Sequence, residues 1–180
     1  MSCAQITKNA LASSLKSLML EKPLPKVSVG EISQRCGMNR KSFYYHFKDK
    51  YDLFNWLFME EFGNYAQKKN YADIFTFLEE ISVYLYNNKA VYTNAIKVWG
   101  QNAFYVFLSE SCVPVFKKRL DSYFDSPEQR DVFAEFLSDV LVSSLAKWLL
   151  RYPKLKPLDY VDLFRIDISG LRRKDNRNAV

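Results

Sequence analysis

The stretch from Val27 to Lys50 constrains the fold more than any other part of the chain. Ser28 is followed three residues later by Glu31, which forms a capping box in which each side chain bonds to the other residue's backbone N–H. A helix should therefore begin near Val29. Gly37 closes the run and suits the left-handed C-terminal cap of that helix. We therefore predict a short helix that ends in a glycine turn.

A second short helix is predicted directly after this turn. Asn39 can cap it, which places Arg40 and Lys41 in its first turn, where backbone N–H groups attract phosphate. Phe43 and Phe47 lie four residues apart, so they would hold the helix to its neighbours. The opposite face then presents cationic, hydroxyl and aromatic side chains. Two short helices with such a face are typical of a DNA-reading helix-turn-helix.

The same residues carry a family resemblance. The run Ser42-Phe43-Tyr44-Tyr45-His46-Phe47, with Gly37 before it and Lys50 and Leu53 after it, resembles the DNA-binding domain of TetR/AcrR transcriptional regulators. Thr7 and the apolar residues after it resemble the first helix of that domain. The resemblance implies an all-α fold of about nine helices. It also implies a DNA-binding domain at residues 1–50 and an effector-sensing and dimerisation domain at residues 51–180.

One departure from the family pattern is visible. The family usually has a glycine between its first two helices, whereas this chain has the segment 22–26, Lys-Pro-Leu-Pro-Lys. Each proline disfavours helix at the residue before it, so the chain must turn here.

Charge is distributed unevenly along the chain. Residues 1–50 hold nine Lys and Arg against three Asp and Glu, a net charge of +6 that equals that of the whole chain. The other 130 residues hold seventeen of each sign. A basic patch confined to one segment suits binding to a phosphate backbone with release of counterions.

Composition limits the class of protein further. The chain has 180 residues, of which 48% are hydrophobic, and only 5 glycines and 6 prolines, which argues against an all-β design. Cys3, Cys36 and Cys112 are an odd number at wide spacing and favour neither a disulfide framework nor a metal site. No apolar run has the length of a signal peptide or of the ~20 residues that span a bilayer. We expect a soluble cytoplasmic protein with no cofactor, no metal and no membrane partner.

Apolar spacing and capping residues predict the remaining helices. They cover about Thr7 to Leu20, Asp49 to Phe62, Asp73 to Leu85, Ala90 to Val98, Ala103 to Phe124, Pro127 to Tyr152 and Pro157 to Leu171. Pro114 lies inside one of them, where a kink or break is expected. Ser126 and Pro127 mark the start of the longest helix.

The longest predicted helix carries a broad apolar stripe. The stripe comprises Phe133, Phe136, Leu137, Val140, Leu141, Ser144, Leu145, Trp148 and Leu149. In chain order, this helix and the last one correspond to the pair that forms a four-helix bundle in TetR-family dimers. The stripe could instead be intramolecular core. Because two half-sites one DNA turn apart need a twofold protein, we predict a homodimer on a palindromic operator.

Individual DNA contacts follow from position and chemistry. Arg40, Lys41 and Tyr44 are candidates for the major groove, since arginine can pair with guanine through two hydrogen bonds. The resemblance implies phosphate contacts for Ser28, Tyr45 and Lys50. Asn39 and Ser42 could contact either bases or phosphates. His46 could contact a phosphate, or its ring could pack against neighbouring residues of the helix.

The sensing function is the least constrained by the sequence. Most TetR relatives release DNA when a small molecule enters a pocket among the middle helices, and aromatic side chains suit such a pocket. The candidates are Tyr84, Tyr92, Trp99, Phe104 and Phe107, although each could equally be plain core. The segment 92–104 resembles regulators of dihydroxyacetone kinase operons, which include an activator with a kinase-like protein co-regulator. The effector could therefore be a protein.

An enzymatic function has little support in the sequence. His46 is the one histidine of the chain, so any catalytic arrangement built on histidine would need it, and it lies on the predicted reading helix. The chain contains no GxxxxGK[ST] or GxGxxG phosphate-binding motif. We therefore expect no enzyme activity and keep a helical enzyme only as a remote alternative.

Overall fold

The structure, a computed structural model, describes residues 3–98 and 104–165. The described residues form helices and connecting loops, with no strand among them, as the predicted all-α class requires. The helices are α1 (Cys3–Glu21), α2 (Val29–Arg35), α3 (Arg40–His46), α4 (Lys50–Phe58), α5 (Asn64–Lys68), α6 (Ile74–Asn87), α7 (Lys89–Ile96), α8 (Phe104–Leu120), α9 (Pro127–Arg151) and α10 (Pro157–Phe164). Short 3-10 turns lie at Leu24–Lys26 and Asp121–Tyr123.

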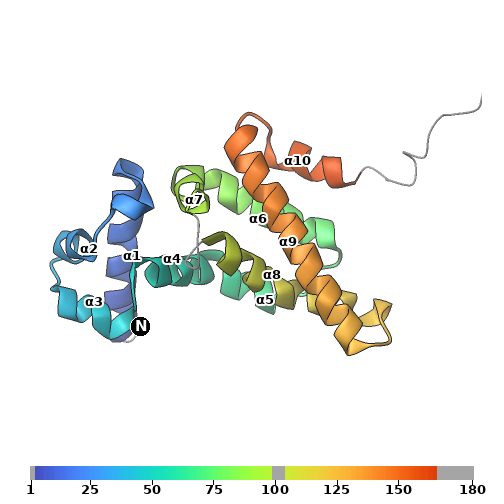
Figure 1. Cartoon of the computed structure of the whole chain (residues 1–180), viewed down its shortest axis with the longest axis horizontal. Helices are drawn as coiled ribbons and strands as arrows, with labels where there is room; N and C mark the ends of the chain where they lie inside the picture. The colour runs from blue at the N-terminus through green and yellow to red at the C-terminus, as the bar shows by residue number, and fades with distance from the viewer. Residues whose placement is uncertain (1–2, 99–103, 166–180) are drawn as a thin grey trace, which may run out of the picture.

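The molecule is elongated, with two parts joined by α4 (Figure 1). Helices α1, α2 and α3 gather at one end, which we call the head. Helices α6 to α10 gather at the other end, which we call the bundle. Helix α4 runs from the head into the bundle and contacts both α1 and α8.

Local capping fixes the helices of the head as predicted. The Ser28 backbone N–H donates to Glu31 Oε2 at 2.9 Å, and the Glu31 N–H donates to Ser28 Oγ at 3.3 Å. Gly37 has a φ of 71°, which is the left-handed conformation that a glycine allows. Asn39 Oδ1 accepts the Ser42 N–H at 2.9 Å and so caps α3.

The buried residues of the head form one end of a core that continues along α4 into the bundle. The buried residues of α1 meet Ile32 of α2 and Phe43 of α3, both fully buried, and Phe47, 4% exposed, closes the core beyond α3. Helix α1 begins at Cys3 rather than at Thr7, because the residues before Thr7 include no glycine or proline to stop it. Val29 and Cys36 pack against this core and are only partly buried.

The helix that joins the two parts contains an irregular turn. Helix α4 continues without a loop through the π turn Met59–Gly63 into α5. With α4 and α5 taken as one helix, the described part of the chain has nine helices. A Cβ on Gly63 would lie 2.4 Å from Met59 Sδ, so the turn fits closely around a residue without a side chain.

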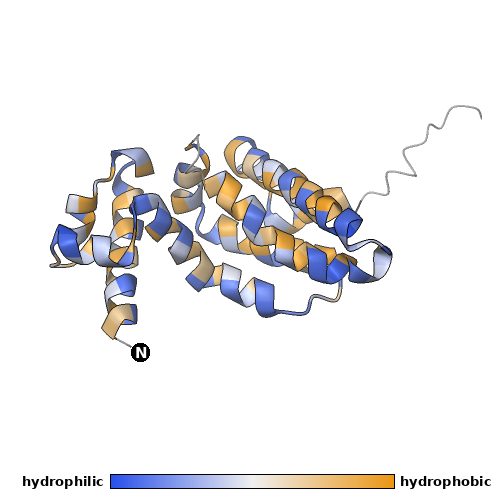
Figure 2. Ribbon diagram, turned by 60° about the horizontal axis from the view of Figure 1, so that its bottom comes forward, coloured by the Kyte–Doolittle hydropathy of each residue, from blue (hydrophilic) through white to orange (hydrophobic). Residues whose placement is uncertain are grey.

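The bundle is built on the long helix α9. Helix α8 packs along α9, and α10 packs across α6. Hydrophobic and hydrophilic residues alternate along these helices, so each has an apolar side (Figure 2). Ser126 Oγ accepts the Gln129 N–H and Pro127 occupies the first turn of α9, as predicted.

One predicted detail of the bundle differs from the structure, and another lies partly outside the described residues. Helix α8 continues through Pro114, so the predicted break does not occur there, and the alternative of a kink stays a prediction. Helix α10 is described only to Phe164, and the rest of the helix predicted to Leu171 lies outside the described residues. No described helix has both the length and the hydropathy that crossing a membrane requires.

Candidate nucleic-acid interface

Helix α3 has a buried side and an exposed side. Phe43 is fully buried and fixes the helix in the head. Around this buried contact, Arg40, Lys41, Tyr44 and Tyr45 are exposed to solvent, with Tyr44 59% and Tyr45 84% exposed. Large aromatic side chains left in solvent on a helix that already buries its apolar side indicate a contact surface.

The cations of the head fall into two groups. In the first group, Lys16 pairs with Glu61 at 2.7 Å, Arg35 pairs with Glu21 at 2.6 Å, and Lys22 pairs with Glu31. The Nζ atom of Lys8 lies 5.7 Å from the ring centres of Phe47 and Trp56. These side chains are engaged within the protein.

The second group comprises Lys26, Arg40, Lys41 and Lys48. All four are exposed, and their side chains make no hydrogen bond or ion pair with any described residue. The sequence-based prediction included Arg40 and Lys41 but missed Lys26 and Lys48. Sequence spacing gives no signal that separates paired from unpaired lysines, because the pairing partners lie on other helices.

Lys50 differs from all of these cations. Its ammonium group donates to the carbonyl oxygens of Pro25 and Val27, both at 2.7 Å. Partial burial lowers the pKa of Lys50, against the attraction of Asp49. Lys50 therefore ties the loop between α1 and α2 to the start of α4, and one N–H of the ammonium group remains for another acceptor.

The remaining predicted DNA-contact residues lie on the same side as the free cations or at its edge. Ser28 and Asn39 occupy the N-caps of α2 and α3. The Ser42 hydroxyl donates to Asn39 Oδ1 at 3.2 Å. His46 is half-buried at the end of α3, and its ring centre lies 4.9 Å from that of Tyr45. The structure thus brings the predicted set together around α2 and α3.

Two family profiles match the chain. One, described as "Bacterial regulatory proteins, tetR family", matches residues 13–57, which span the head and most of α4. The other, described as "Transcriptional regulator C-terminal region", matches residues 72–170, more than half of the chain. The chain belongs to the TetR family of bacterial transcriptional regulators. It is accordingly a DNA-binding regulator, and its family is not one of enzymes.

Solved structures of TetR-family proteins have the same fold. One is described as "Dihydroxyacetone kinase operon activator DhaS", with 20% identity, a TM-score of 0.63, and 92% of this chain and 97% of that chain covered. Another is NalD, the secondary repressor of the MexAB-OprM multidrug efflux pump in Pseudomonas aeruginosa, with 17% identity, a TM-score of 0.60, and 92% and 95% covered. No curated protein matches the chain.

The predicted effector residues of this TetR-family chain meet in one aromatic cluster, except Trp99, which lies outside the described residues. The ring centres of Tyr84 and Tyr92 lie 5.4 Å apart, and those of Tyr92 and Phe104 also 5.4 Å apart. Phe107 lies 6.2 Å from Phe104. Because Tyr92 is fully buried and Phe104 is 2% exposed, a ligand that entered here would have to separate these rings.

A polar chain leads from this cluster to the head. The hydroxyl groups of Tyr84 and Tyr92 are hydrogen-bonded to each other, and the Tyr84 hydroxyl lies 2.7 Å from Glu61 Oε2. Glu61, in the π turn, pairs with Lys16 of α1. Burial raises the pKa of both tyrosines well above the ordinary value, so both hydroxyls stay protonated. The Asn94 side chain adds a second link from α7 to α1 by donating to Met19 O at 2.9 Å.

Helix α9 divides its predicted apolar stripe between two faces. Leu141, Leu145, Trp148 and Leu149 are buried inside the chain. Three stripe residues and one neighbour remain exposed on another face: Val132 (62%), Phe133 (38%), Phe136 (60%) and Val140 (46%). On α10, Leu158, Leu163 and Phe164 are exposed as well.

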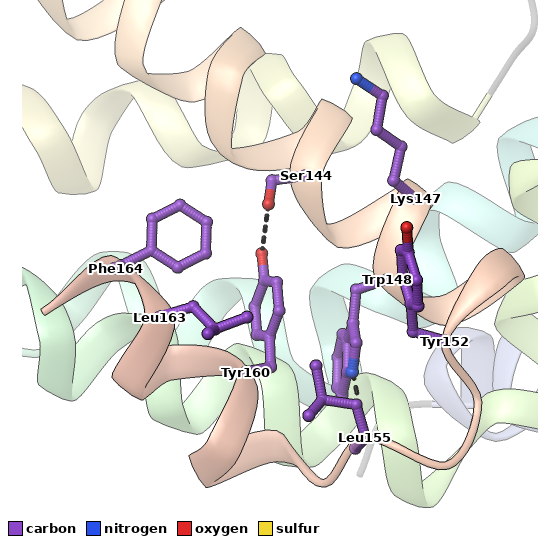
Figure 3. Close-up of a pocket in the computed structure, with 8 residues that line it drawn as sticks. All are labelled: Ser144, Lys147, Trp148, Tyr152, Leu155, Tyr160, Leu163 and Phe164. Carbon is purple, nitrogen blue, oxygen red and sulfur yellow. Dashed lines mark hydrogen bonds between the residues drawn. The ribbon is translucent and has the colours of Figure 1, made fainter. Parts of the chain in front are cut away.

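A groove of about 310 Å³ separates α9 from α10 (Figure 3). Trp148 and Tyr160 stack with ring centres 4.5 Å apart, and the Tyr160 hydroxyl donates to Ser144 Oγ at 3.0 Å. Leu163 and Phe164 line the α10 side. The groove and the exposed apolar side chains of both helices make a mainly apolar surface.

Within residues 3–98 and 104–165, no three His, Cys, Asp or Glu side chains gather as a metal site would require. The three cysteines are free, and burial raises the pKa of the Cys112 thiol to about 12. A thiol with so high a pKa is a poor nucleophile at neutral pH.

Proposed function

We propose that two copies of this chain bind a palindromic operator through residues 28–50, the domain that we place at residues 1–50. The observation that carries this proposal is the coincidence of unpaired cations and exposed tyrosines around α3. Cations without an internal partner lose no ion pair when they bind phosphate. The whole net charge of the chain lies in the same segment.

Within this interface, we assign base contacts to the first turn of α3 and its tyrosine, namely Arg40, Lys41 and Tyr44. Arg40 is the strongest candidate for guanine, because it is an exposed residue in the first turn of α3 and has no acidic partner among the described residues. Phosphate contacts are assigned to Ser28, Tyr45, His46 and the remaining N–H of Lys50, and we add Lys26 and Lys48 to them. Asn39 and Ser42 stay open to either kind of contact.

Dimerisation is assigned to the apolar surface of α9 and α10. A buried phenylalanine or valine contributes about 1.5–3 kcal/mol relative to an exposed one, so a patch that includes Phe133, Phe136 and Val140 favours association. A second copy is the occupant proposed here because a palindromic operator requires a twofold partner.

Control of DNA binding is assigned to the aromatic cluster of Tyr84, Tyr92, Phe104 and Phe107, with Trp99 as a fifth candidate. An effector that separates these rings would also disturb the hydrogen bond from Tyr84 to Glu61, and hence the contact with Lys16 on α1. A shift of α1 relative to α4 would change the separation of the two heads.

A second candidate is that the bundle docks a kinase-like protein co-regulator. The close packing of the aromatic cluster favours it, because a protein can bind the bundle without separating buried rings. Co-elution of the regulator with such a protein would support this candidate. Saturable binding of a small hydrophobic ligand that releases DNA would contradict it.

The DNA-binding proposal is tested with the DNA upstream of the protein's own gene. Footprinting should reveal a twofold-symmetric protected site at an inverted repeat. Arg40→Ala should weaken binding to that site by roughly 5- to 150-fold, the range for one two-bond arginine–guanine contact. Equal affinity of the wild type for the repeat and for scrambled DNA would contradict the proposal.

A further inference from the structure

The first turn of α2 contains a glycine that its backbone does not require. Gly30 lies within the seven-residue helix α2, where glycine is less favourable than alanine. Among the described glycines only Gly37 has a positive φ, so Gly30 adopts a conformation open to any residue. The reason for a glycine at this position must lie in what approaches it.

The side chain of Arg40 approaches Gly30. A Cβ placed on Gly30 would lie 2.6 Å from Nη2 of Arg40, 3.0 Å from its Nε and 3.2 Å from its Cζ. Distances below 3.0 Å are too short for a real Cβ, so any side chain at Gly30 would displace the guanidinium group. The guanidinium group thus lies directly against the backbone of α2, beside a hollow of about 430 Å³ between α2 and α3.

This contact holds Arg40 without neutralising it. The side chain makes no ion pair or hydrogen bond with a described residue, and the neighbouring acid Glu31 is bonded to Lys22 and Ser28. A carboxylate partner would fix the arginine equally well but would compete with the operator for its charge. The missing side chain of Gly30 leaves the space that the guanidinium group occupies beside α2, which we call the notch, and no carboxylate takes up its N–H donors there.

We propose that Gly30 is a positioning residue for DNA recognition, because it forms the notch that orients Arg40 toward one base pair in each half-site. The inference rests on the proposed function, in which Arg40 reads a base. It adds a residue that need not touch DNA and yet sets specificity.

The test is selection of binding sites from a randomised half-site library, followed by competition with single base-pair variants of the selected operator. The full-length proteins are the wild type, Gly30→Ala, Arg40→Ala and the double variant. Arg40→Ala should lose preference at one base pair per half-site. Gly30→Ala should lower preference at that same base pair by roughly 2- to 12-fold, the range for ordering one long side chain at an interface. Other positions should keep their preference.

The double variant separates positioning from a structural effect. If Gly30 acts through Arg40, adding Gly30→Ala to Arg40→Ala should change no base preference. The midpoint of thermal unfolding of Gly30→Ala should be equal to or above that of the wild type, because alanine favours a helix.

Each possible failure has its own meaning. If Arg40→Ala keeps the base preferences of the wild type, Arg40 does not read a base and Gly30 does not position it for reading. If Arg40→Ala loses the preference and Gly30→Ala keeps it, the notch alone is wrong. A Gly30→Ala effect that persists without Arg40, or that spreads over all positions, would also overturn the inference.

Discussion

The head and the bundle differ in their balance of charge, although each contains paired cations and exposed ones. In the bundle, Lys117 pairs with Asp131 at 2.9 Å, Arg130 bridges Asp121 and Asp131, and Lys69 pairs with Glu80. In the head, Lys26, Arg40, Lys41 and Lys48 have no such partner among the described residues. The free cations of the head lie in a segment with a net charge of +6, whereas the exposed Lys118, Arg119 and Lys147 of the bundle lie in a part of the chain whose charges balance.

Apolar groups have the opposite distribution. Helix α3 buries its phenylalanine and leaves amphipathic tyrosines in solvent, and the exposed apolar side chains of α1, Ile6 and Leu20, lie far apart along that helix. The bundle leaves phenylalanine and valine side chains uncovered along α9. A surface with free positive charge suits a polyanion, whereas a surface with free apolar area suits a protein. The difference supports the proposal that DNA binds at one end of the molecule and a second copy at the other.

The largest effect is expected from charge on the apolar face. The double change Phe136→Asp and Val140→Asp should convert the dimer into a monomer at micromolar concentration, because two carboxylates would have to be buried in the interface. Operator affinity should fall by more than about 100-fold, since each half-site would then be bound separately. Sedimentation and DNA titration measure the two quantities.

The control for this change is Val83→Asp. Val83 lies on α6 and is 40% exposed, close to the 46% of Val140. It should leave the protein dimeric. If the double variant remained dimeric, the exposed face of α9 would not be part of the dimer interface.

Removing a free cation should weaken DNA binding in a salt-dependent way. Lys41→Ala and Lys48→Ala should each reduce the slope of log affinity against log salt by about 0.9, the value for one phosphate contact. Lys69→Ala, which removes a cation that follows α5 and is paired with Glu80 of α6, should leave the slope unchanged. Equal slopes for all three variants would mean that internal pairing does not distinguish DNA-binding cations.

Lys50 tests a cation of the head that is held internally. Lys50→Met should lower the free energy of unfolding by about 1–2 kcal/mol, because the Pro25 and Val27 carbonyls lose their donor. Lys48→Met is the matched control, and as an exposed residue it should change stability by less than about 0.5 kcal/mol. Urea unfolding measures both values. Equal stability of the two variants would contradict the structural role of Lys50.

The smallest expected effect is a pH dependence at the capping box. The bonds from Lys22 and Ser28 lower the pKa of Glu31 from 4.5 to about 2. Because the pKa is lower in the folded state, the contribution of Glu31 is present above about pH 4.5 and is lost as the pH falls toward 2.

Over that pH range the wild type should therefore lose more stability than Glu31→Gln does. Lys22→Met should weaken the dependence in the same direction, because it removes the first of the bonds that lower the pKa. Stability curves of wild type and Glu31→Gln that run parallel from pH 5 to 2 would contradict this assignment.

The sequence predicted those features that depend on a few neighbouring residues. The caps at Ser28, Asn39 and Ser126, and the glycine turn at Gly37, follow from short-range hydrogen bonding and backbone sterics. Helix bounds were therefore close to the observed ones over most of the described chain.

Features that depend on which helices meet could not be predicted in the same way. The stripe of α9 seemed single in the sequence, yet Leu145 faces the inside of the chain and Phe136 faces solvent. Lys50 is bonded to the loop that departs from the family pattern, which its position alone does not reveal. The link from Tyr84 through Glu61 to Lys16 depends on a π turn, for which the sequence has no established signal.

The π turn at Met59–Gly63 also has a consequence for operator geometry. A π turn accommodates one residue more than an α-helical path of the same length, and one residue corresponds to a rotation of about 100° around a helix axis. Everything before Met59 is therefore rotated relative to α6–α10 by an amount that a single residue fixes. Deleting one residue here would restore a regular helix and turn each reading surface away from its groove. In the proposed dimer, the angle between the two reading surfaces would therefore depend on one turn of the connecting helix, far from any base.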